Sequence, residues 1–155
     1  DAGCGYGHLV QMLRDIGVVA GGFDSQAMWQ GQCRWLKRAD LTCRDISVAF
    51  DVRAFDVVMC REVLEHLTVL QIQRAVSNLC WLSSRLVYIT TRFNPSPVSI
   101  WDVQTSDMLD PTHISLLPND LLRTLFVLEG FKRRADLEAR MDWQRKGRCL
   151  VYERS

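Results

Sequence analysis

Apolar positions along the chain follow two alternating spacings. Short runs rich in apolar residues are typical of buried strands, and they predict strands over residues 18–23, 41–46, 55–60 and 85–91. Between these runs apolar residues recur at helical spacing, which predicts helices over 8–16, 26–38 and 63–82, the last interrupted near Leu67 and Thr68. Strands that alternate with helices in this way indicate a parallel sheet covered on both faces. The predicted fold class is therefore α/β, with a doubly wound sheet.

The pattern changes after residue 91. Residues 92–118 contain all four prolines of the chain and predict a long loop, and loops of this length inside a compact domain usually carry function. Pro118 then opens a helix that ends at Gly130. Residues 131–137 and 149–153 are two further predicted strands, whose short separation suits an antiparallel hairpin. The predicted buried face of the helix consists of Leu121, Leu122, Leu125, Phe126 and Leu128.

The composition is that of an ordinary folded domain. Hydrophobic residues make up 48% and charged residues 24%, which disfavours a disordered or fibrous chain. Lys and Arg total 19 against 18 Asp and Glu, so a strongly basic surface for nucleic acid or membrane is not indicated. No apolar run approaches the roughly 18 residues of a membrane span, and we expect a cytoplasmic protein. The six cysteines include no CxxC pair, and we expect them to be reduced.

A glycine-rich segment, residues 1–7, precedes the first predicted helix. Glycine at such a turn lets the backbone approach a ligand closely and directs helix N-terminal N–H groups toward it. Asp24 ends the next predicted strand, where a carboxylate can accept hydrogen bonds from ribose hydroxyls. Asp45 ends the strand after that and can accept from an adenine amine. Each feature alone fits a turn or a cap equally well, but together they predict a nucleoside-containing ligand.

These features resemble the class I S-adenosylmethionine-dependent methyltransferases, over essentially the whole chain. Residues 1–7 look like the first motif of that family, 22–25 like its ribose-binding strand end, 45–46 like its adenine contact, and 55–67 like its fourth strand and following helix. The resemblance implies a Rossmann-like, mainly parallel sheet with a C-terminal antiparallel hairpin, and S-adenosylmethionine as the cofactor. The cofactor-binding residues that it implies are Asp1, Gly3, Cys4, Gly5, Gly7, Asp24, Ser25, Asp45, Ile46, Cys60, Arg61 and Glu62.

Two other functions fit the same fold class. A dinucleotide-dependent oxidoreductase would need the GxGxxG spacing, but His8 stands where its third glycine belongs, so the spacing favours the methyl donor. A methyltransferase-like domain that binds partners without catalysis is the non-enzymatic alternative. We expect S-adenosylmethionine-dependent methyl transfer, with oxygen as the favoured acceptor atom.

A second group of polar residues consists of Glu62, Glu65 and His66. On a helix, residues at i, i+3 and i+4 share one face, so these side chains suit a hard divalent cation, although a solvated face has the same pattern. The group resembles the ExxEH face with which ubiquinone-pathway O-methyltransferases and small-RNA 3′-terminal 2′-O-methyltransferases bind a divalent metal, together with another histidine. The resemblance implies that His113, in the long loop, is the fourth ligand to Mg²⁺ or Mn²⁺.

The same histidines are the expected catalytic residues. A metal at this group would orient an acceptor hydroxyl and lower its pKa. Without a metal, His66 or His113 is the expected general base, because imidazole titrates near neutral pH. A small-molecule acceptor is favoured. RNA is the alternative through the basic run 132–134, a run that is more typical of a solvated strand edge.

The position of the first motif at the start of the sequence affects the expected number of strands and the expected stability of the domain. In the family that the chain resembles, the first acidic residue closes the central first strand, so a chain that begins at Asp1 is expected to contain almost none of that strand. Its two neighbours would then have unpaired backbone groups, each costing about 1–3 kcal/mol when buried. We therefore expect residues 1–155 to form a single, N-terminally truncated domain that is less stable than an extended chain.

Overall fold

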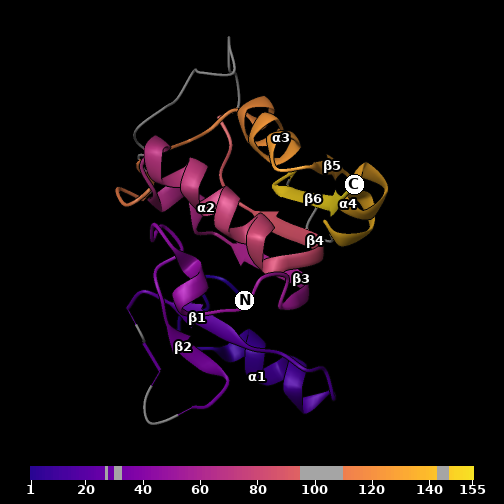
Figure 1. Cartoon of the computed structure of the whole chain (residues 1–155). Helices are drawn as coiled ribbons and strands as arrows, with labels where there is room; N and C mark the ends of the chain where they lie inside the picture. Colours follow the sequence, from indigo (N-terminus) through magenta and orange to yellow (C-terminus); the bar gives the residue numbers. More distant parts are fainter. Residues whose placement is uncertain (27, 30–32, 95–109, 143–146) are drawn as a thin grey trace.

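The computed structural model describes residues 1–26, 28–29, 33–94, 110–142 and 147–155, which form two sheets and the helices that pack on them (Figure 1). The strands are β1 (Gly22–Asp24), β2 (Leu36–Arg38), β3 (Phe55–Arg61), β4 (Ser83–Thr90), β5 (Phe131–Arg133) and β6 (Cys149–Arg154). The helices are α1 (His8–Asp15), α2 (Val69–Leu82), α3 (Asn119–Leu128) and α4 (Ala135–Met141), with short 3₁₀ helices η1 (Ile46–Val48) and η2 (Leu64–His66).

The strand pairing confirms the predicted fold class. One sheet is two-stranded, with β1 parallel to β2, and the other has the order β3-β4-β6-β5. In the larger sheet β3 and β4 are parallel, whereas β6 runs antiparallel to both β4 and β5. The architecture is a Rossmann-like α/β fold with an antiparallel C-terminal strand pair.

Ala2 connects the two sheets. It forms isolated parallel bridges with Phe23 of β1 and Cys60 of β3, and the N-terminus lies between these two strands in Figure 1. The Ala2 N–H donates to Met59 O at 2.7 Å, and the Phe23 N–H donates to Asp1 O at 3.0 Å. Between β1 and β3 the described residues therefore place only a short stretch of backbone, at Asp1 and Ala2.

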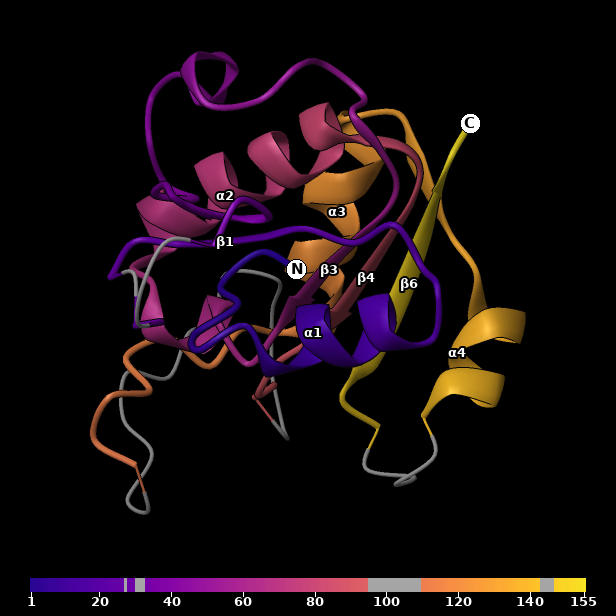
Figure 2. The same cartoon turned by 90° about the horizontal axis from the view of Figure 1, so that it is seen from below.

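Helices lie on both sides of the strands, as predicted (Figure 2). Figure 2 shows α2 and α3 on one side of the strands and α1 and α4 on the other. Alternate residues of β4 divide between two cores: Val87 and Ile89 join the α2 and α3 side, while Tyr88 joins a smaller cluster with Val151 and Leu137. Phe126 of α3 stacks on Tyr152 of β6 with ring centroids 4.0 Å apart. The larger core stabilises the sheet edge that carries the site described below.

Several elements of the N-terminal half differ from the prediction. The predicted helix over 26–38 is wrong, because its described residues include no helix and Leu36–Arg38 is strand β2. Residues 27 and 30–32 of this prediction lie outside the described residues. The predicted strand over 41–46 is also wrong, because Leu41 and Ile46 reach the core from a loop and from η1. In the run 18–23 only the end is strand, and Val19 is 96% exposed.

The C-terminal half follows the prediction more closely. The interruption near Leu67 and Thr68 is confirmed, because η2 ends there and Thr68 begins α2 with a reciprocal capping box to Gln71. Strand β5 is shorter than predicted, since residues 135–141 form α4 instead. Leu128, predicted to be buried, is 76% exposed. The middle of the predicted long loop, 95–109, lies outside the described residues.

Two expectations from composition can be compared with the structure. All six cysteines are free thiols, as predicted. Within the described part of the chain, every helix is too short or too polar to cross a membrane.

Candidate functional site

The glycine-rich loop has one open position and two crowded ones. Gly3, Gly5 and Gly7 all have positive φ angles, of 76°, 52° and 79°. A Cβ atom on Gly3 would lie 2.4 Å from Val63 Cγ2, and one on Gly7 would lie 2.6 Å from Leu36 Cδ1. A Cβ atom on Gly5 would meet nothing within 4 Å. Gly3 and Gly7 are therefore needed for close packing, whereas Gly5 borders open space that a ligand can occupy.

Asp24, the last residue of β1, is hydrogen bonded to the glycine-rich loop. Its Oδ2 accepts the Gly5 N–H at 3.0 Å, and its Oδ1 accepts the Gln26 N–H at 2.9 Å. The next residue, Ser25, accepts a hydrogen bond on its carbonyl oxygen from Arg38 Nε at 3.1 Å. The structure thus brings together the predicted glycine motif and the predicted acidic strand end, and each Asp24 oxygen keeps a further lone pair for a ligand.

Asp1 carries a buried carboxylate at the start of the same loop. Its side chain is 3% exposed, and Oδ2 lies 3.4 Å from Arg61 Nη2. Its Oδ1 is buried and has no hydrogen-bond partner among the described residues. A buried carboxylate oxygen without a donor is unfavourable, so this atom is suited to a cationic or N–H group of a ligand.

The two predicted cysteines of this site face the protein interior. Cys60 of β3 is fully buried, and burial raises the pKa of its thiol to about 12. Burial also raises the pKa of the Cys4 thiol, which packs beside Gly22. Both residues are therefore inert thiols that can meet a cofactor through their backbone groups.

Asp45 caps η1. Its Oδ1 accepts hydrogen bonds from the Ser47 N–H at 2.9 Å and from Ser47 Oγ, and these bonds lower the pKa of Asp45. The side chain of Ile46 lies in the core. The interpretation of Asp45 as a cap is confirmed. Its contact with adenine stays a prediction, in which Ile46 can take part through its backbone.

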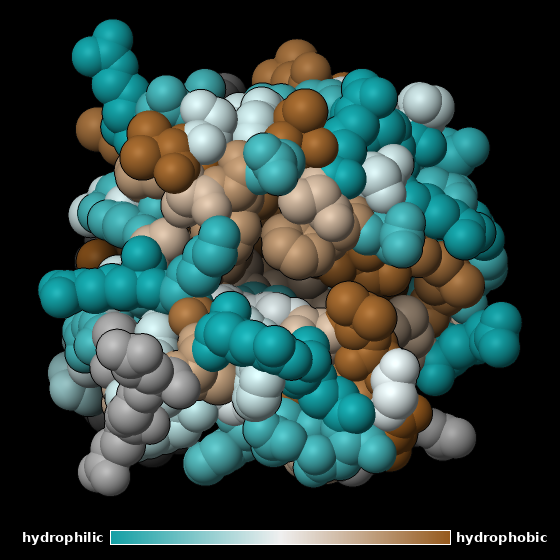
Figure 3. Space-filling model, turned by 60° about the horizontal axis from the view of Figure 1, so that its bottom comes forward, coloured by the Kyte–Doolittle hydropathy of each residue, from teal (hydrophilic) through white to brown (hydrophobic). Residues whose placement is uncertain are grey.

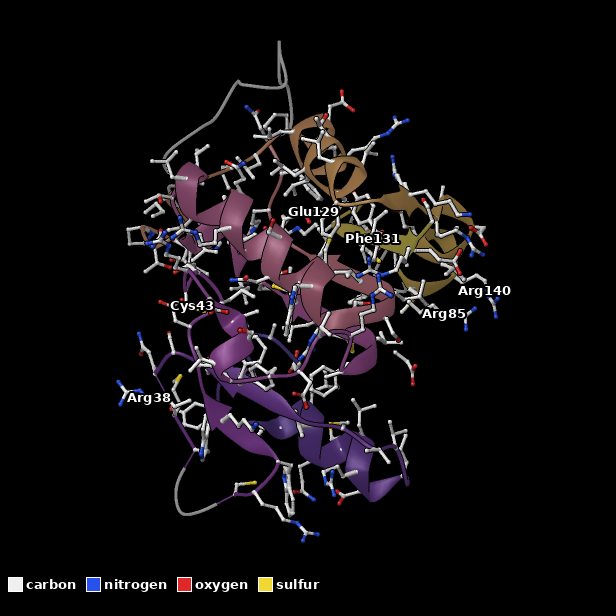
Figure 4. All side chains as sticks on the ribbon, viewed as in Figure 1. Arg38, Cys43, Arg85, Glu129, Phe131 and Arg140 are labelled. Atoms are coloured by element: carbon white, nitrogen blue, oxygen red, sulfur yellow. The ribbon has the colours of Figure 1, made fainter. Side chains whose placement is uncertain are left out.

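The segment before Asp45 is fixed by a residue that the sequence reasoning missed. Asn78 of α2 is buried, and its Nδ2 donates to Leu41 O at 2.7 Å and to Cys43 O at 3.0 Å. Figure 4 labels Cys43 in this segment, beside α2. A polar residue among the apolar positions of α2 was the available signal.

A second set of groups gathers at η2. Among the described residues, Glu65, His66 and His113 each offer one ligand atom, and these atoms lie within 4.8 Å of one another. We call these three residues the Glu65 cluster. Glu65 is fully buried, His113 is buried and His66 is exposed. The loop that carries His113 is fixed here because the Ile114 and Ser115 N–H groups both donate to Glu65 O, at 2.9 and 3.1 Å.

Each member of the Glu65 cluster has a partner on one side. Glu65 Oε2 accepts from Thr91 Oγ1 at 2.7 Å, and Oε1 is buried without a partner among the described residues. His66 Nδ1 lies 3.1 Å from Thr112 O. Since a carbonyl oxygen only accepts, neutral His66 has its proton on Nδ1 and a lone pair on Nε2. His113 Nε2 lies 3.3 Å from Asp110 Oδ2.

Glu62 lies beside this cluster and outside it. Its Oε2 is 3.9 Å from Arg148 Nη1, and its φ angle of 51° is in the left-handed region. The premise of one helical face is therefore wrong, because residues 62–66 form a left-handed residue followed by a 3₁₀ turn. Burial raises the pKa of Glu65, and the nearby charge of Glu62 raises it further. Of the four predicted metal ligands, the structure thus brings three together, with the fourth adjacent.

The fold and the site together define a class. A glycine loop followed by an acidic strand end, in a parallel α/β sheet with an antiparallel C-terminal strand, is the arrangement of class I S-adenosylmethionine-dependent methyltransferases. Residues 1–135 match the model of the methyltransferase domain family. The chain belongs to that family, which confirms the predicted enzyme class and favours it over an oxidoreductase.

Several solved structures have a similar fold. Magnesium protoporphyrin IX methyltransferase from Synechocystis PCC 6803, with bound SAM, gives a TM-score of 0.64 at 20% identity, covering 100% of this chain and 68% of that one. A SAM-dependent methyltransferase from Archaeoglobus fulgidus gives 0.70 at 13% identity, covering 99% and 84%. An O-methyltransferase family protein from Burkholderia thailandensis gives 0.66 at 18% identity, covering 100% and 50%. No curated protein matches the sequence significantly.

Proposed function

We propose that this chain transfers the methyl group of S-adenosylmethionine to a hydroxyl oxygen of a small acceptor, with a divalent cation bound at the Glu65 cluster. One observation carries the proposal: Gly3 of the glycine loop lies against Val63, two residues before Glu65 in the chain. A Cβ atom on Gly3 would lie only 2.4 Å from Val63, which stands between Glu62 and Glu65 in the chain. A donor on the loop and an acceptor at the cluster would therefore be neighbours, as methyl transfer requires.

The donor site fits the cofactor by its chemistry. S-adenosylmethionine supplies an electrophilic methyl group on a sulfonium, together with an amino group and a ribose. The unpartnered Asp1 Oδ1 suits the amino group, and the remaining lone pairs of Asp24 suit the ribose hydroxyls. The open side of Gly5 leaves room for the ligand to approach the backbone. The remaining predicted cofactor residues are Gly3, Cys4, Gly7, Ser25, Asp45, Ile46, Cys60, Arg61 and Glu62.

The cation site fits Mg²⁺ or Mn²⁺ by its donor set. The Glu65 carboxylate suits Mg²⁺ or Mn²⁺, and its Oε1 is a buried acceptor without a partner among the described residues. The two imidazole nitrogens favour Mn²⁺, the softer of these two cations. Glu62 is close enough to raise the pKa of Glu65 and completes the predicted set of four ligands. A cation bound there would orient the acceptor hydroxyl and lower its pKa.

Proton removal can also be assigned to this chain's own groups. His66 is exposed, and the hydrogen-bond geometry at Thr112 O leaves its Nε2 as the basic nitrogen. His66 can therefore accept the hydroxyl proton directly if it is not bound to the cation. His113 is buried, and its ring centroid lies 4.9 Å from that of His66. His113 is the second candidate base.

The ion pairs of the two arginines in the basic run 132–134 favour a small acceptor over RNA. Arg133 forms a bidentate ion pair with Glu138, with N–O distances of 2.8–3.0 Å. Arg134 pairs with both Asp136 and Glu153. Arginines that are already paired with carboxylates contribute little to phosphate binding.

The cation can be tested by titrating Mn²⁺ into the protein and measuring bound metal by electron paramagnetic resonance. We expect one Mn²⁺ site. Loss of a group that hydrogen bonds to a metal ligand typically weakens metal binding by about 10-fold or more. Because His113 is a proposed ligand itself, we expect His113→Ala to weaken Mn²⁺ binding by at least about tenfold. His8→Ala is the matched control, because His8 is an exposed residue of α1. Equal affinities for wild type and His113→Ala would contradict the cation proposal.

The acceptor atom is tested separately. Wild-type protein with S-adenosylmethionine and Mn²⁺ is offered panels of small alcohols and phenols, amines and thiols, and S-adenosylhomocysteine release is measured. We expect release with hydroxyl acceptors and its loss on chelation of the metal. Release with amines or thiols alone would contradict transfer to oxygen.

A further inference from the structure

Thr91 lies directly behind the Glu65 cluster, one residue past the end of β4. Its side chain is buried, and its hydroxyl donates to Glu65 Oε2 at 2.7 Å. Its backbone N–H donates to Arg148 O at 3.3 Å, which connects it to the segment that enters β6. Thr91 is therefore fixed by the sheet, and its hydroxyl has a defined direction.

This hydrogen bond controls the orientation of Glu65. A carboxylate is planar, so fixing Oε2 also fixes the place of Oε1. Oε1 is the buried oxygen without a partner among the described residues. Meanwhile the backbone of Glu65 is fixed independently, by the N–H groups of Ile114 and Ser115. Backbone and side chain are thus both anchored, which leaves Oε1 as the atom that Glu65 can offer to the cluster.

We propose that Thr91 is a positioning residue for the cation site: its hydroxyl occupies Glu65 Oε2 so that Oε1 is presented to the divalent cation. This inference rests on the proposed function, because the cation is part of that proposal. Groups that hydrogen bond to a metal ligand fix its orientation, and their loss typically weakens metal binding by about 10–100-fold.

A pair of variants separates the hydroxyl from the packing of the side chain. Thr91→Val keeps the shape and removes the hydroxyl, whereas Thr91→Ser keeps the hydroxyl and removes a methyl group. We expect Thr91→Val to weaken Mn²⁺ binding by about 10–100-fold and Thr91→Ser to stay within about threefold of wild type. Binding of S-adenosylhomocysteine is expected to be unchanged in both. Thr90→Val is the control, because it removes the neighbouring hydroxyl.

The outcomes distinguish this inference from the proposed function. If wild type binds Mn²⁺, His113→Ala weakens binding and Thr91→Val does not, the role of Thr91 is overturned while the cation site stands. Equal losses in Thr91→Val and Thr91→Ser would also overturn it, because packing would then explain the effect. If wild type binds no Mn²⁺, both proposals fall. Loss in Thr91→Val alone, with melting temperature and S-adenosylhomocysteine affinity retained, is the result that we expect.

Discussion

The glycine loop packs against Val63, two residues before Glu65 of the Glu65 cluster, yet the loop and the cluster are built from different groups. In the loop the main chain forms the surface, with glycines at positive φ. In the cluster, side chains form the surface: Glu65 and His113 are buried, His66 is exposed, and each has a partner. An added methyl group should therefore disrupt the loop most, whereas the loss of one hydrogen bond should disrupt the cluster most.

The two regions also differ in their support. The cluster lies at the end of a four-stranded sheet with a continuous core. The loop rests on β1, which pairs with the three-residue strand β2 and, through Ala2, with β3. Met12, Ile16 and Val19 are largely exposed on this side of the molecule, and Figure 3 shows apolar patches around a hollow in the face that it brings forward. Local opening is therefore expected first on the loop side.

The largest expected effect comes from adding a methyl group to the crowded part of the loop. Gly3→Ala should lower the free energy of unfolding by about 2–4 kcal/mol, through left-handed strain and the clash with Val63. Gly5→Ala should lower it by only about 1–2 kcal/mol, because its Cβ meets open space. Yet Gly5→Ala should weaken S-adenosylhomocysteine binding strongly, because the added methyl group would enter the space proposed for the ligand. Urea unfolding measures the stability of the two variants, and calorimetry measures their S-adenosylhomocysteine affinity. A greater loss of stability in Gly5→Ala than in Gly3→Ala would contradict the described packing.

The next effect concerns the space between β1 and β3. We propose that a strand placed before Asp1 would pair with both, since Ala2 already bridges Phe23 and Cys60 in parallel register. An N-terminal extension of alternating β-branched residues should then raise the free energy of unfolding by about 2 kcal/mol or more, because unpaired buried backbone groups cost about 1–3 kcal/mol each. A flexible Gly-Ser extension of the same length is the control. Equal melting temperatures for the two extended proteins would refute this prediction.

A smaller effect is expected at Asn78. Asn78→Leu removes both hydrogen bonds to the segment before Asp45 and should lower the free energy of unfolding by about 1–3 kcal/mol. It should also raise the KM for S-adenosylmethionine while changing kcat little, because the affected segment leads to the predicted adenine contact. The control is Gln73→Ala, at an exposed position of α2. A change in kcat with no change in KM would contradict the role assigned to Asn78.

The smallest effect tests backbone strain at Glu62. Its φ of 51° suits glycine, so Glu62→Gly should be more stable than Glu62→Ala by about 1 kcal/mol. Both variants should bind Mn²⁺ less tightly than wild type, since both lack the carboxylate. Thermal unfolding and Mn²⁺ titration of the two proteins make the comparison. If Glu62→Ala were the more stable variant, the left-handed conformation would be in doubt.

The parts of the fold that the sequence predicts correctly are those in which local pattern and tertiary role agree. Strand β3 is apolar from Val57 to Cys60 and pairs with both Ala2 and β4, and Thr68 begins α2 with local capping groups. By contrast, Leu36–Arg38 is a strand only because of its register with β1, which no local pattern reveals. Leu41 and Ile46 are buried from irregular backbone, which resembles a strand in its composition.

The site shows the same division. The glycine motif and Asp24 can be recognised because their spacing is imposed by the turn that they form. The approach of His113 to Glu65 could be inferred only from the resemblance, because it depends on backbone hydrogen bonds from Ile114 and Ser115. Thr91 and Asn78 have no motif of their own, and their roles follow only from what they contact.

The central claim is that the edge formed by the glycine loop and Asp24 binds S-adenosylmethionine. The most direct measurement is calorimetric titration of wild type and Asp24→Asn with S-adenosylhomocysteine and, separately, with NAD, using Asp51→Asn as an exposed control. We predict that wild type and Asp51→Asn bind S-adenosylhomocysteine equally, that Asp24→Asn binds it at least about tenfold more weakly, a loss of about 1.4 kcal/mol, and that none binds NAD. Binding of NAD without binding of S-adenosylhomocysteine would contradict the account.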